Sequence, residues 1–174
     1  MIAAVVLAAG EASRFGHPKQ ELLLPHVLRR LAHAQLDDLV VVLGAYSFEV
    51  EGARVVTCPD WERGPGASLR AGLAALGSGV EAAVVCLADG PLIAAGAVDR
   101  VVTAWRQGAG DLVAASYGGV RSHPIVIGRR AWPEIPDDGG RALAPALVPC
   151  DDLGAPADVD TEEDLRRIEG MLGE

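Results

Sequence analysis

Two basic residues stand in one short, glycine-containing loop near the amino terminus. Lys19 is the only lysine among 174 residues, although the chain carries fourteen arginines. It closes the segment 10–19, which contains Arg14 and follows a strand-like apolar run over 2–7. A compact ammonium on a flexible stem fits beside a phosphate where a broad planar guanidinium does not. Backbone amides and the two cations could therefore surround a triphosphate, although a solvated basic loop is equally consistent with these residues.

Carboxylates follow two other segments. Asp89 comes directly after 82–88, the most hydrophobic strand-like run in the chain. A carboxylate at the tip of a buried strand is costly unless something compensates it, and a divalent cation does so through oxygen ligands. Asp158 and Asp160 alternate in an extended stretch, so both could face one ion. Two structural alternatives remain open: Asp89 as a turn residue, and Asp160 or Thr161 as the N-cap of a helix.

The common phosphate-binding fingerprints are absent from the first loop. A P-loop requires a glycine five residues after Gly10, where this chain has Phe15, and Gly16 is followed by His17 rather than lysine. The Gly-x-Gly-x-x-Gly fingerprint of dinucleotide-binding proteins is also missing. A nucleotide site at this loop must therefore belong to another class.

The composition limits the partners that the chain can have. The formal net charge is −9, whereas nucleic acids and anionic membrane surfaces attract proteins through accumulated positive charge. The amino-terminal apolar run is too short to span a membrane and lacks the basic region of a signal peptide. The three cysteines lack a metal-binding spacing and indicate buried thiols in a reducing compartment. We therefore expect a cytoplasmic protein without a nucleic-acid or membrane partner.

Strand-like and helix-like segments alternate along the chain. Apolar runs predict strands over 2–8, 39–43, 54–58, 82–88, 111–116, 124–127 and 146–149. Helical spacing of apolar residues predicts helices over 26–36, from about 67, over 95–107 and from Thr161. This alternation predicts one domain, 1–174, with a three-layer α/β fold in which helices cover both faces of a mostly parallel, twisted sheet. Ligands of such sheets bind beyond the carboxyl ends of the strands.

The first loop resembles a family signature. Residues 7–20 read Leu-Ala-Ala-Gly-Glu-Ala-Ser-Arg-Phe-Gly-His-Pro-Lys-Gln and are similar to the LAAGxSxRxGxPK motif of the MobA-like NTP transferases. Within that family they are most similar to the molybdenum-cofactor cytidylyltransferases. The resemblance implies a Rossmann-like nucleotidyltransferase fold, a nucleotide held by the loop backbone and a triphosphate bound by the two cations. The implied nucleotide-binding positions are Leu7, Ala8, Ala9, Gly10, Arg14 and Lys19.

A second segment, 58–72, is similar to the family's N-P-x-W-x-x-G-x-x-x-S-L-x-x-G element, which recognises the base. The resemblance implies that Gly66 and Ser68 bind the nucleotide. From the residues alone, Ser68 could instead satisfy amides in the first turn of a helix, and Gly72 could let that helix approach the sheet closely. The family's asparagine is Cys58 here, which removes a hydrogen-bonding side chain.

The acidic residues also resemble family elements. Leu-Ala-Asp-Gly-Pro at 87–91 matches the LADxP metal motif, and 158–165 is similar to the DIDTPEDL element. The resemblance therefore implies Mg²⁺ bound by Asp89, Asp160 and Asp158. Arg14 and Lys19, together with Asp89, are the implied catalytic residues.

Two further residues are implied on the acceptor side. His123 lies in Arg-Ser-His-Pro, which resembles the family's Gly-His-Pro element, although Ser122 replaces the glycine. Arg141 follows two glycines in a stretch that resembles a G-x-R element. The resemblance places both near the acceptor substrate. From the residues alone, His123 could equally be a turn residue that enters the strand predicted over 124–127.

The implied reaction is nucleotidyl transfer. An NMP, with CMP from CTP favoured, would move to a phosphorylated acceptor such as molybdopterin, and pyrophosphate would leave. A phosphate nucleophile is already anionic, so catalysis would depend on alignment and charge neutralisation. One departure leaves alternatives open, because 20–25 runs almost directly into the next helix where the family usually has a glycine hairpin. The alternatives are an enzyme that uses GTP or another small acceptor, and a nucleotide-binding regulator without turnover.

Overall fold

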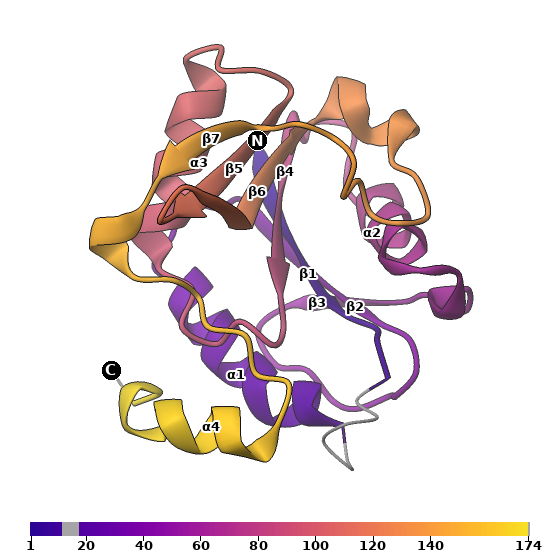
Figure 1. The fold of residues 1–174 in the computed structure, drawn as a ribbon. Coiled ribbons are helices and arrows are strands. Elements are labelled where there is room, and N and C mark those ends of the chain that lie inside the picture. Colours follow the sequence, from indigo (N-terminus) through magenta and orange to yellow (C-terminus); the bar gives the residue numbers. More distant parts are fainter. Residues whose placement is uncertain (12–17, 174) are drawn as a thin grey trace.

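The computed structural model describes residues 1–11 and 18–173, which form a seven-stranded sheet (Figure 1). The strands are β1 (Ile2–Ala8), β2 (Asp38–Leu43), β3 (Arg54–Thr57), β4 (Ala82–Leu87), β5 (Leu112–Tyr117), β6 (Val120–Gly128) and β7 (Ala146–Pro149). Their order is β3-β2-β1-β4-β6-β5-β7. β6 is antiparallel to its neighbours β4 and β5, and the other neighbouring pairs are parallel. The prediction of a mostly parallel sheet is confirmed.

Helices cover both faces of the sheet. They are α1 (Lys19–Leu31), α2 (Pro65–Ala74), α3 (Ala95–Arg106) and α4 (Glu162–Ile168), with 3-10 turns at Trp61–Arg63, Arg129–Glu134, Asp151–Leu153 and Glu169–Met171. α2 packs on one face, whereas α1 and α3 pack on the other, and α4 lies beside α1 (Figure 1). The predicted three-layer α/β architecture is confirmed. Within residues 1–11 and 18–173, no helix has the length and apolar character needed to cross a membrane.

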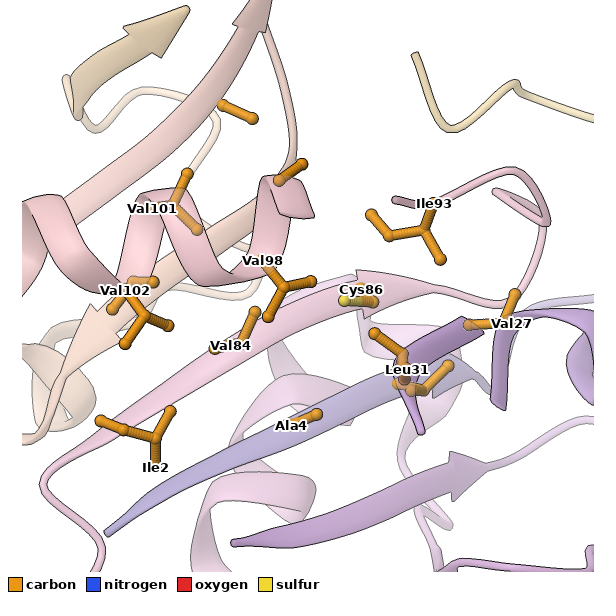
Figure 2. Close-up of a cluster of buried hydrophobic side chains, with 14 of the residues drawn as sticks. Ile2, Ala4, Val27, Leu31, Val84, Cys86, Ile93, Val98, Val101 and Val102 are labelled. Atoms are coloured by element: carbon orange, nitrogen blue, oxygen red, sulfur yellow. The ribbon is translucent and has the colours of Figure 1, made fainter. Parts of the chain in front are cut away.

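β1 is buried on both faces because its alternating side chains enter two separate cores. Ile2, Ala4 and Val6 belong to the core beneath α1 and α3, whereas Ala3 and Val5 belong to the core beneath α2. Figure 2 shows the first core, where side chains from α1, α3, β1 and β4 meet. A strand without a solvated face has no place for polar side chains, which explains the uninterrupted apolar run at the amino terminus.

Gly72 lets α2 lie very close to the sheet. A β-carbon at this position would lie 2.5 Å from Val5 Cγ1 and 2.8 Å from Val42 Cγ2. A larger residue must therefore push α2 away from β1 and β2. The structure therefore confirms that Gly72 lets α2 pack closely on the sheet.

The first helix begins earlier than predicted. The prediction of a helix over 26–36 was wrong at both ends, because α1 begins at Lys19 and ends at Leu31. The helix contains Pro25, whose exposed position keeps its ring on the solvent side. Proline removes one backbone hydrogen bond and crowds the preceding turn, but the apolar residues of this helix are buried against the sheet and against α4, which outweighs that loss. The buried apolar residues of α1 are Leu23, Leu24, Val27 and Leu31.

The last helix begins where the sequence predicted it. Thr161 Oγ1 accepts a hydrogen bond from the Asp164 N–H at 3.2 Å, and the Asp164 carboxylate accepts one from the Thr161 N–H at 2.9 Å. This reciprocal capping box confirms the predicted capped helix. β6 is longer than the predicted strand over 124–127, because its first half pairs with β5 in a hairpin. His123 therefore lies within a strand rather than in a turn.

Candidate active site

Four of the residues implied by the first loop, Leu7 to Gly10, lie at the carboxyl end of β1. Ala8 ends this strand and Ala9 follows it, and both are buried. Together with Leu7 and Gly10 they line a cavity of about 330 Å³. Ser68, in the first turn of α2, forms another part of the wall. The structure therefore brings these five residues to one cavity, at the sheet edge where ligands of α/β proteins bind.

Two residues that the sequence analysis did not assign also line this cavity. Gln20 is buried in the first turn of α1, and its Nε2 donates to the Gly10 carbonyl at 3.0 Å, which ties the helix to the loop. Trp61 lies in the 3-10 turn before α2. Gln20 ends the motif at 7–20, and Trp61 lies within the motif at 58–72. Their positions in these motifs could have indicated that they line the cavity.

Gly66, which the resemblance implies as a nucleotide-binding residue, contacts the segment 136–137 in the structure. It does not line the cavity that Ser68 lines, and its N–H donates to the Asp137 carbonyl at 2.9 Å. A β-carbon at Gly66 would collide with the carbonyl oxygen of Pro136. In this structure Gly66 therefore serves close packing between α2 and the segment 136–137. Arg14, the other cation of the first loop, lies outside the described residues.

Lys19 is the first residue of α1, and its side chain turns inward, leaving only 9% of its surface exposed. Its Nζ donates to the Val159 carbonyl at 2.6 Å, to Asp160 Oδ1 at 2.9 Å and to Asp89 Oδ2 at 3.4 Å. The structure therefore brings the solitary lysine together with two of the acids expected to bind a metal. These residues are 70 and 141 positions from Lys19 in the chain.

Backbone hydrogen bonds fix the carboxyl-terminal segment against the end of β4. The Val159 N–H donates to the Asp89 carbonyl at 3.0 Å, and the Leu92 N–H donates to the Pro156 carbonyl at 2.8 Å. Val159 is fully buried and shares a small apolar cluster with Leu23 of α1. Because side chains alternate in an extended segment, burial of this valine turns its two acidic neighbours toward the strand ends.

Three carboxylates converge at this junction. Asp89, Asp158 and Asp160 each offer one carboxylate oxygen, and these oxygens lie within 4.8 Å of one another. Thr161, not Asp160, caps α4, so the Asp160 carboxylate is left to contact Lys19. The sequence left open whether Asp160 or Thr161 is the N-cap of the last helix, and the structure shows that it is Thr161.

The electrostatics of the three acids favour an additional cation. Burial raises the pKa of the Asp89 carboxyl above its usual range, against the opposing effect of Lys19, and the Asp160 charge raises it further. Burial also raises the pKa of Asp158, and the Asp89 and Asp160 charges add to that effect. Carboxylates that lie close together, with Asp89 partly buried among them, are stabilised by a divalent ion, and oxygen ligands suit Mg²⁺ or Mn²⁺. The residues present therefore fit such an ion.

The residues implied on the acceptor side line a second cavity of about 380 Å³. His123 and Arg141 both face it, and Leu7 and Leu87 line this cavity as well as the first one. The rest of its wall is mostly aliphatic, contributed by Leu69, Val85, Leu112, Ile125, Ile127, Ile135 and Leu143. A smaller cavity of about 110 Å³ is lined by His123, Asp89 and Asp158. The acceptor side and the acidic group therefore lie next to each other.

His123 is electrically neutral in this environment. Burial lowers the pKa of its imidazole to about 4, and the positive charge of Arg121 contributes to the shift. An anionic ligand in the second cavity would therefore find positive charge on Arg121 and Arg141. His123 could contribute only a neutral hydrogen bond.

Comparisons with known proteins assign the chain to a family. The model of the MobA-like NTP transferase domain matches residues 4–148. The chain belongs to the MobA-like NTP transferase family. No protein in the curated set matches the chain. The predicted membership of this family is thus confirmed, and the family is one of nucleotidyltransferases.

Solved structures extend the likeness over the whole domain. Rv0371c from Mycobacterium tuberculosis is 29% identical, with a TM-score of 0.84 over 99% of this chain and 98% of that chain. A complex of Rv0371c with manganese is 26% identical, with a TM-score of 0.77 over 96% of this chain and 97% of that chain. Molybdopterin-guanine dinucleotide biosynthesis protein A from Archaeoglobus fulgidus is 17% identical, with a TM-score of 0.70 over 98% of each chain, and shows the shared fold.

The residues of the candidate site lie partly inside and partly outside the range that the family model matches. Residues 4–148 contain Lys19, Asp89 and the cavity around Ser68. Asp158 and Asp160 lie beyond that range, in the segment that the backbone bonds fix against β4. The acidic group is therefore completed by residues outside the matched part.

Proposed function

We propose that this NTP transferase moves an NMP, with CMP from CTP favoured, to a phosphorylated acceptor such as molybdopterin and releases pyrophosphate. The observation that carries the proposal is the meeting of Lys19 Nζ with the Asp89 and Asp160 carboxylates beside the cavity of residues 7–10. A triphosphate and its cation need positive charge and oxygen ligands at one place. The similarity of the first loop to the cytidylyltransferase signature favours CTP.

The nucleotide would lie in the cavity lined by Leu7, Ala8, Ala9 and Gly10. Their backbone would surround the phosphates, while Ser68 would bond to the base and Gln20 would keep α1 against the loop. Arg14 is included among the phosphate-binding residues from the motif. The Gly66 N–H donates to the Asp137 carbonyl, so Gly66 would support the nucleotide site by positioning α2.

The chemistry is in-line displacement at the α-phosphorus. An oxygen of the acceptor phosphate forms a bond to this phosphorus, and the bond to the bridging oxygen breaks, so that pyrophosphate leaves with the electron pair. Lys19 and Arg14 stabilise the negative charge that develops on the leaving group. Asp89, Asp160 and Asp158 would bind Mg²⁺, which supplies further charge neutralisation at the phosphates when it is present. No protein base is required, because the nucleophile is already ionised.

The acceptor would occupy the second cavity, next to the acidic group. Arg141 would attract its phosphate, and neutral His123 would position it through a hydrogen bond. The aliphatic wall of this cavity supports an acceptor with an apolar or ring-shaped body in addition to its phosphate. The proximity of His123 to Asp89 and Asp158 around the cavity of about 110 Å³ supports the same placement.

The test is a panel of NTPs with Mg²⁺, first by thermal shift and then by pyrophosphate release with a candidate acceptor. A ligand that binds only the folded protein raises the melting temperature with its affinity, so we expect the largest shift with CTP. A larger shift with GTP would favour the GTP-using alternative. Stabilisation without pyrophosphate release would favour a regulator, an alternative that rests on the short segment 20–25. No thermal shift with any NTP would refute the CTP-using enzyme, the GTP-using enzyme and the nucleotide-binding regulator alike.

A further inference from the structure

The Lys19 ammonium already has an acceptor for each of its donors. An ammonium has three N–H groups, and three oxygens lie within hydrogen-bond distance of Nζ: Val159 O at 2.6 Å, Asp160 Oδ1 at 2.9 Å and Asp89 Oδ2 at 3.4 Å. In this arrangement no N–H remains for a phosphate oxygen. Lys19 must give up at least one of these bonds before it can bind a triphosphate.

Two of its partners belong to the acidic group that fits a divalent ion. Asp89 and Asp160, with Asp158, present the oxygens that lie within 4.8 Å of one another. An ammonium and a divalent ion on the same two carboxylates would repel each other, and the enclosure of Lys19 and the partial burial of Asp89 strengthen that repulsion. Lys19 has a flexible side chain and can move. The backbones of Val159 and Asp89 are held together by a hydrogen bond and are therefore more fixed. The ammonium and the metal are thus alternatives.

We propose that Lys19 is an internal counter-ion of the acidic group until nucleotide and metal arrive, and that its transfer to the triphosphate couples the binding of the two. The inference rests on the proposed function for the identity of the nucleotide. Without nucleotide, the ammonium opposes metal binding. A triphosphate draws the ammonium away and leaves three carboxylates for the metal. Each ligand then increases the affinity of the other, as linkage requires.

The position of Asp89 makes this transfer a short one. Asp89 contacts Lys19 and also lines the cavity assigned to the nucleotide. A lysine that leaves Asp89 therefore remains beside the phosphates. The longest of its three hydrogen bonds, at 3.4 Å, is the one to Asp89, and we expect it to break first.

The first experiment measures Mn²⁺ binding to the protein without nucleotide, from the electron paramagnetic resonance signal of free Mn²⁺. We expect Lys19→Met to bind Mn²⁺ at least tenfold more tightly than the wild type. Arg106→Met removes the same charge from an exposed position at the end of α3 and should change the affinity less than twofold. Equal or weaker binding by Lys19→Met would overturn the proposal. Asp89→Asn should abolish binding; unchanged binding would show a metal site elsewhere and would also overturn it.

Loss of Lys19 removes the cation that contacts Asp89 and Asp160 in the described part of the chain and could prevent folding, so a second measurement uses the wild type. In a crystal structure with Mn²⁺ bound, we expect Lys19 Nζ to have lost its hydrogen bonds to Asp89 and Asp160. A bound ion with both bonds retained would overturn the proposal. Neither measurement needs turnover. Absent pyrophosphate release would refute the proposed function alone, whereas an active enzyme with unchanged Mn²⁺ affinity in Lys19→Met would refute only the counter-ion role.

Discussion

Lys19 is a charged residue whose side chain is almost completely buried. A buried charge tolerates little change in size or shape, so the residue type at this position should matter. Its side chain is 9% exposed and contacts three oxygens. A guanidinium is wider and planar, and its five donors cannot replace a tetrahedral ammonium in the same space. The sequence singled out this residue because it is the only lysine, and the structure supplies a physical reason for that choice.

We expect Lys19→Arg to lower the turnover rate at least tenfold, and Lys19→Met to lower it by about 10²–10³, by analogy with lost transition-state donors. The measurement is pyrophosphate release under saturating NTP. Arg106→Lys, the reverse exchange at an exposed position, serves as the control and should leave the rate unchanged. Near wild-type turnover in Lys19→Arg would mean that the lysine is there by chance.

Ser68 should contribute to nucleotide affinity more than to folding. It is buried at 4% exposure and lines the nucleotide cavity. Ser68→Ala removes one hydrogen-bonding group, so we expect the dissociation constant for the preferred NTP to rise about tenfold, equivalent to about 1.4 kcal/mol. Isothermal titration calorimetry measures this change, with Ser78→Ala in an exposed turn as the matched control. An unchanged constant would assign Ser68 to the helix start instead.

At the scale of elements, the packing of α2 on the sheet should be sensitive to a single methyl group. Gly72→Ala places a β-carbon 2.5 Å from Val5 Cγ1, and such overpacking costs about 1–3 kcal/mol. The better helix propensity of alanine returns about 1 kcal/mol. We expect a net decrease in the free energy of unfolding, measured by urea denaturation. Gly77→Ala, where a β-carbon meets open space, should change it by less than about 0.5 kcal/mol.

The starts of β2 and β3 are joined by an ion pair that predicts a pH dependence. Asp38 accepts from Arg54 Nε at 3.2 Å and from the Leu39 N–H at 2.8 Å. The Arg54 hydrogen bond holds the pKa of the Asp38 carboxyl below its usual range, against the effect of burial, and the Leu39 N–H lowers it further. A lowered folded-state pKa contributes stability that is present above the unfolded pKa of about 3.9 and is lost as the pH falls through the folded value.

We therefore expect Asp38→Asn to lower the free energy of unfolding at pH 7 by about 1 kcal/mol. The difference from wild type should shrink as the pH falls below about 4. Urea denaturation at several pH values tests both statements. Glu49→Gln, an exposed carboxylate outside this pair, should show neither effect. If the difference in the free energy of unfolding persists undiminished at pH 2–3, its cause is packing rather than charge.

At the scale of the molecule, ligand binding should connect segments that are distant in sequence. The end of β1, the Asp89 turn and the segment 157–161 meet around Lys19. We expect NTP and Mg²⁺ together to slow amide hydrogen exchange at 7–10, 88–90 and 157–161. β7, at the far edge of the sheet, should show no change. Protection confined to 7–10 would indicate that the nucleotide binds without engaging the acidic group.

Much of the fold was predictable because its elements are marked by local patterns. Continuous apolar runs predicted the buried strands, since β1 and β4 have no solvated face. Thr161 and Asp164 marked the start of α4 through a capping box that spans four residues. The start of α1 was not predictable in this way. It depends on burial of Leu23 against Val159, which is far away in the chain.

The sequence by itself determined the family, the layered architecture and the residue types that can bind phosphate and metal. These follow from short motifs and from apolar periodicity, which are local properties of the chain. Only the tertiary structure decided which groups meet: it placed Lys19 against Asp89 and Asp160 and bonded the Gly66 amide to Asp137. The physical reason is that these contacts join residues 70 or more positions apart, or depend on how closely a helix packs, and neither is encoded by spacing along the chain.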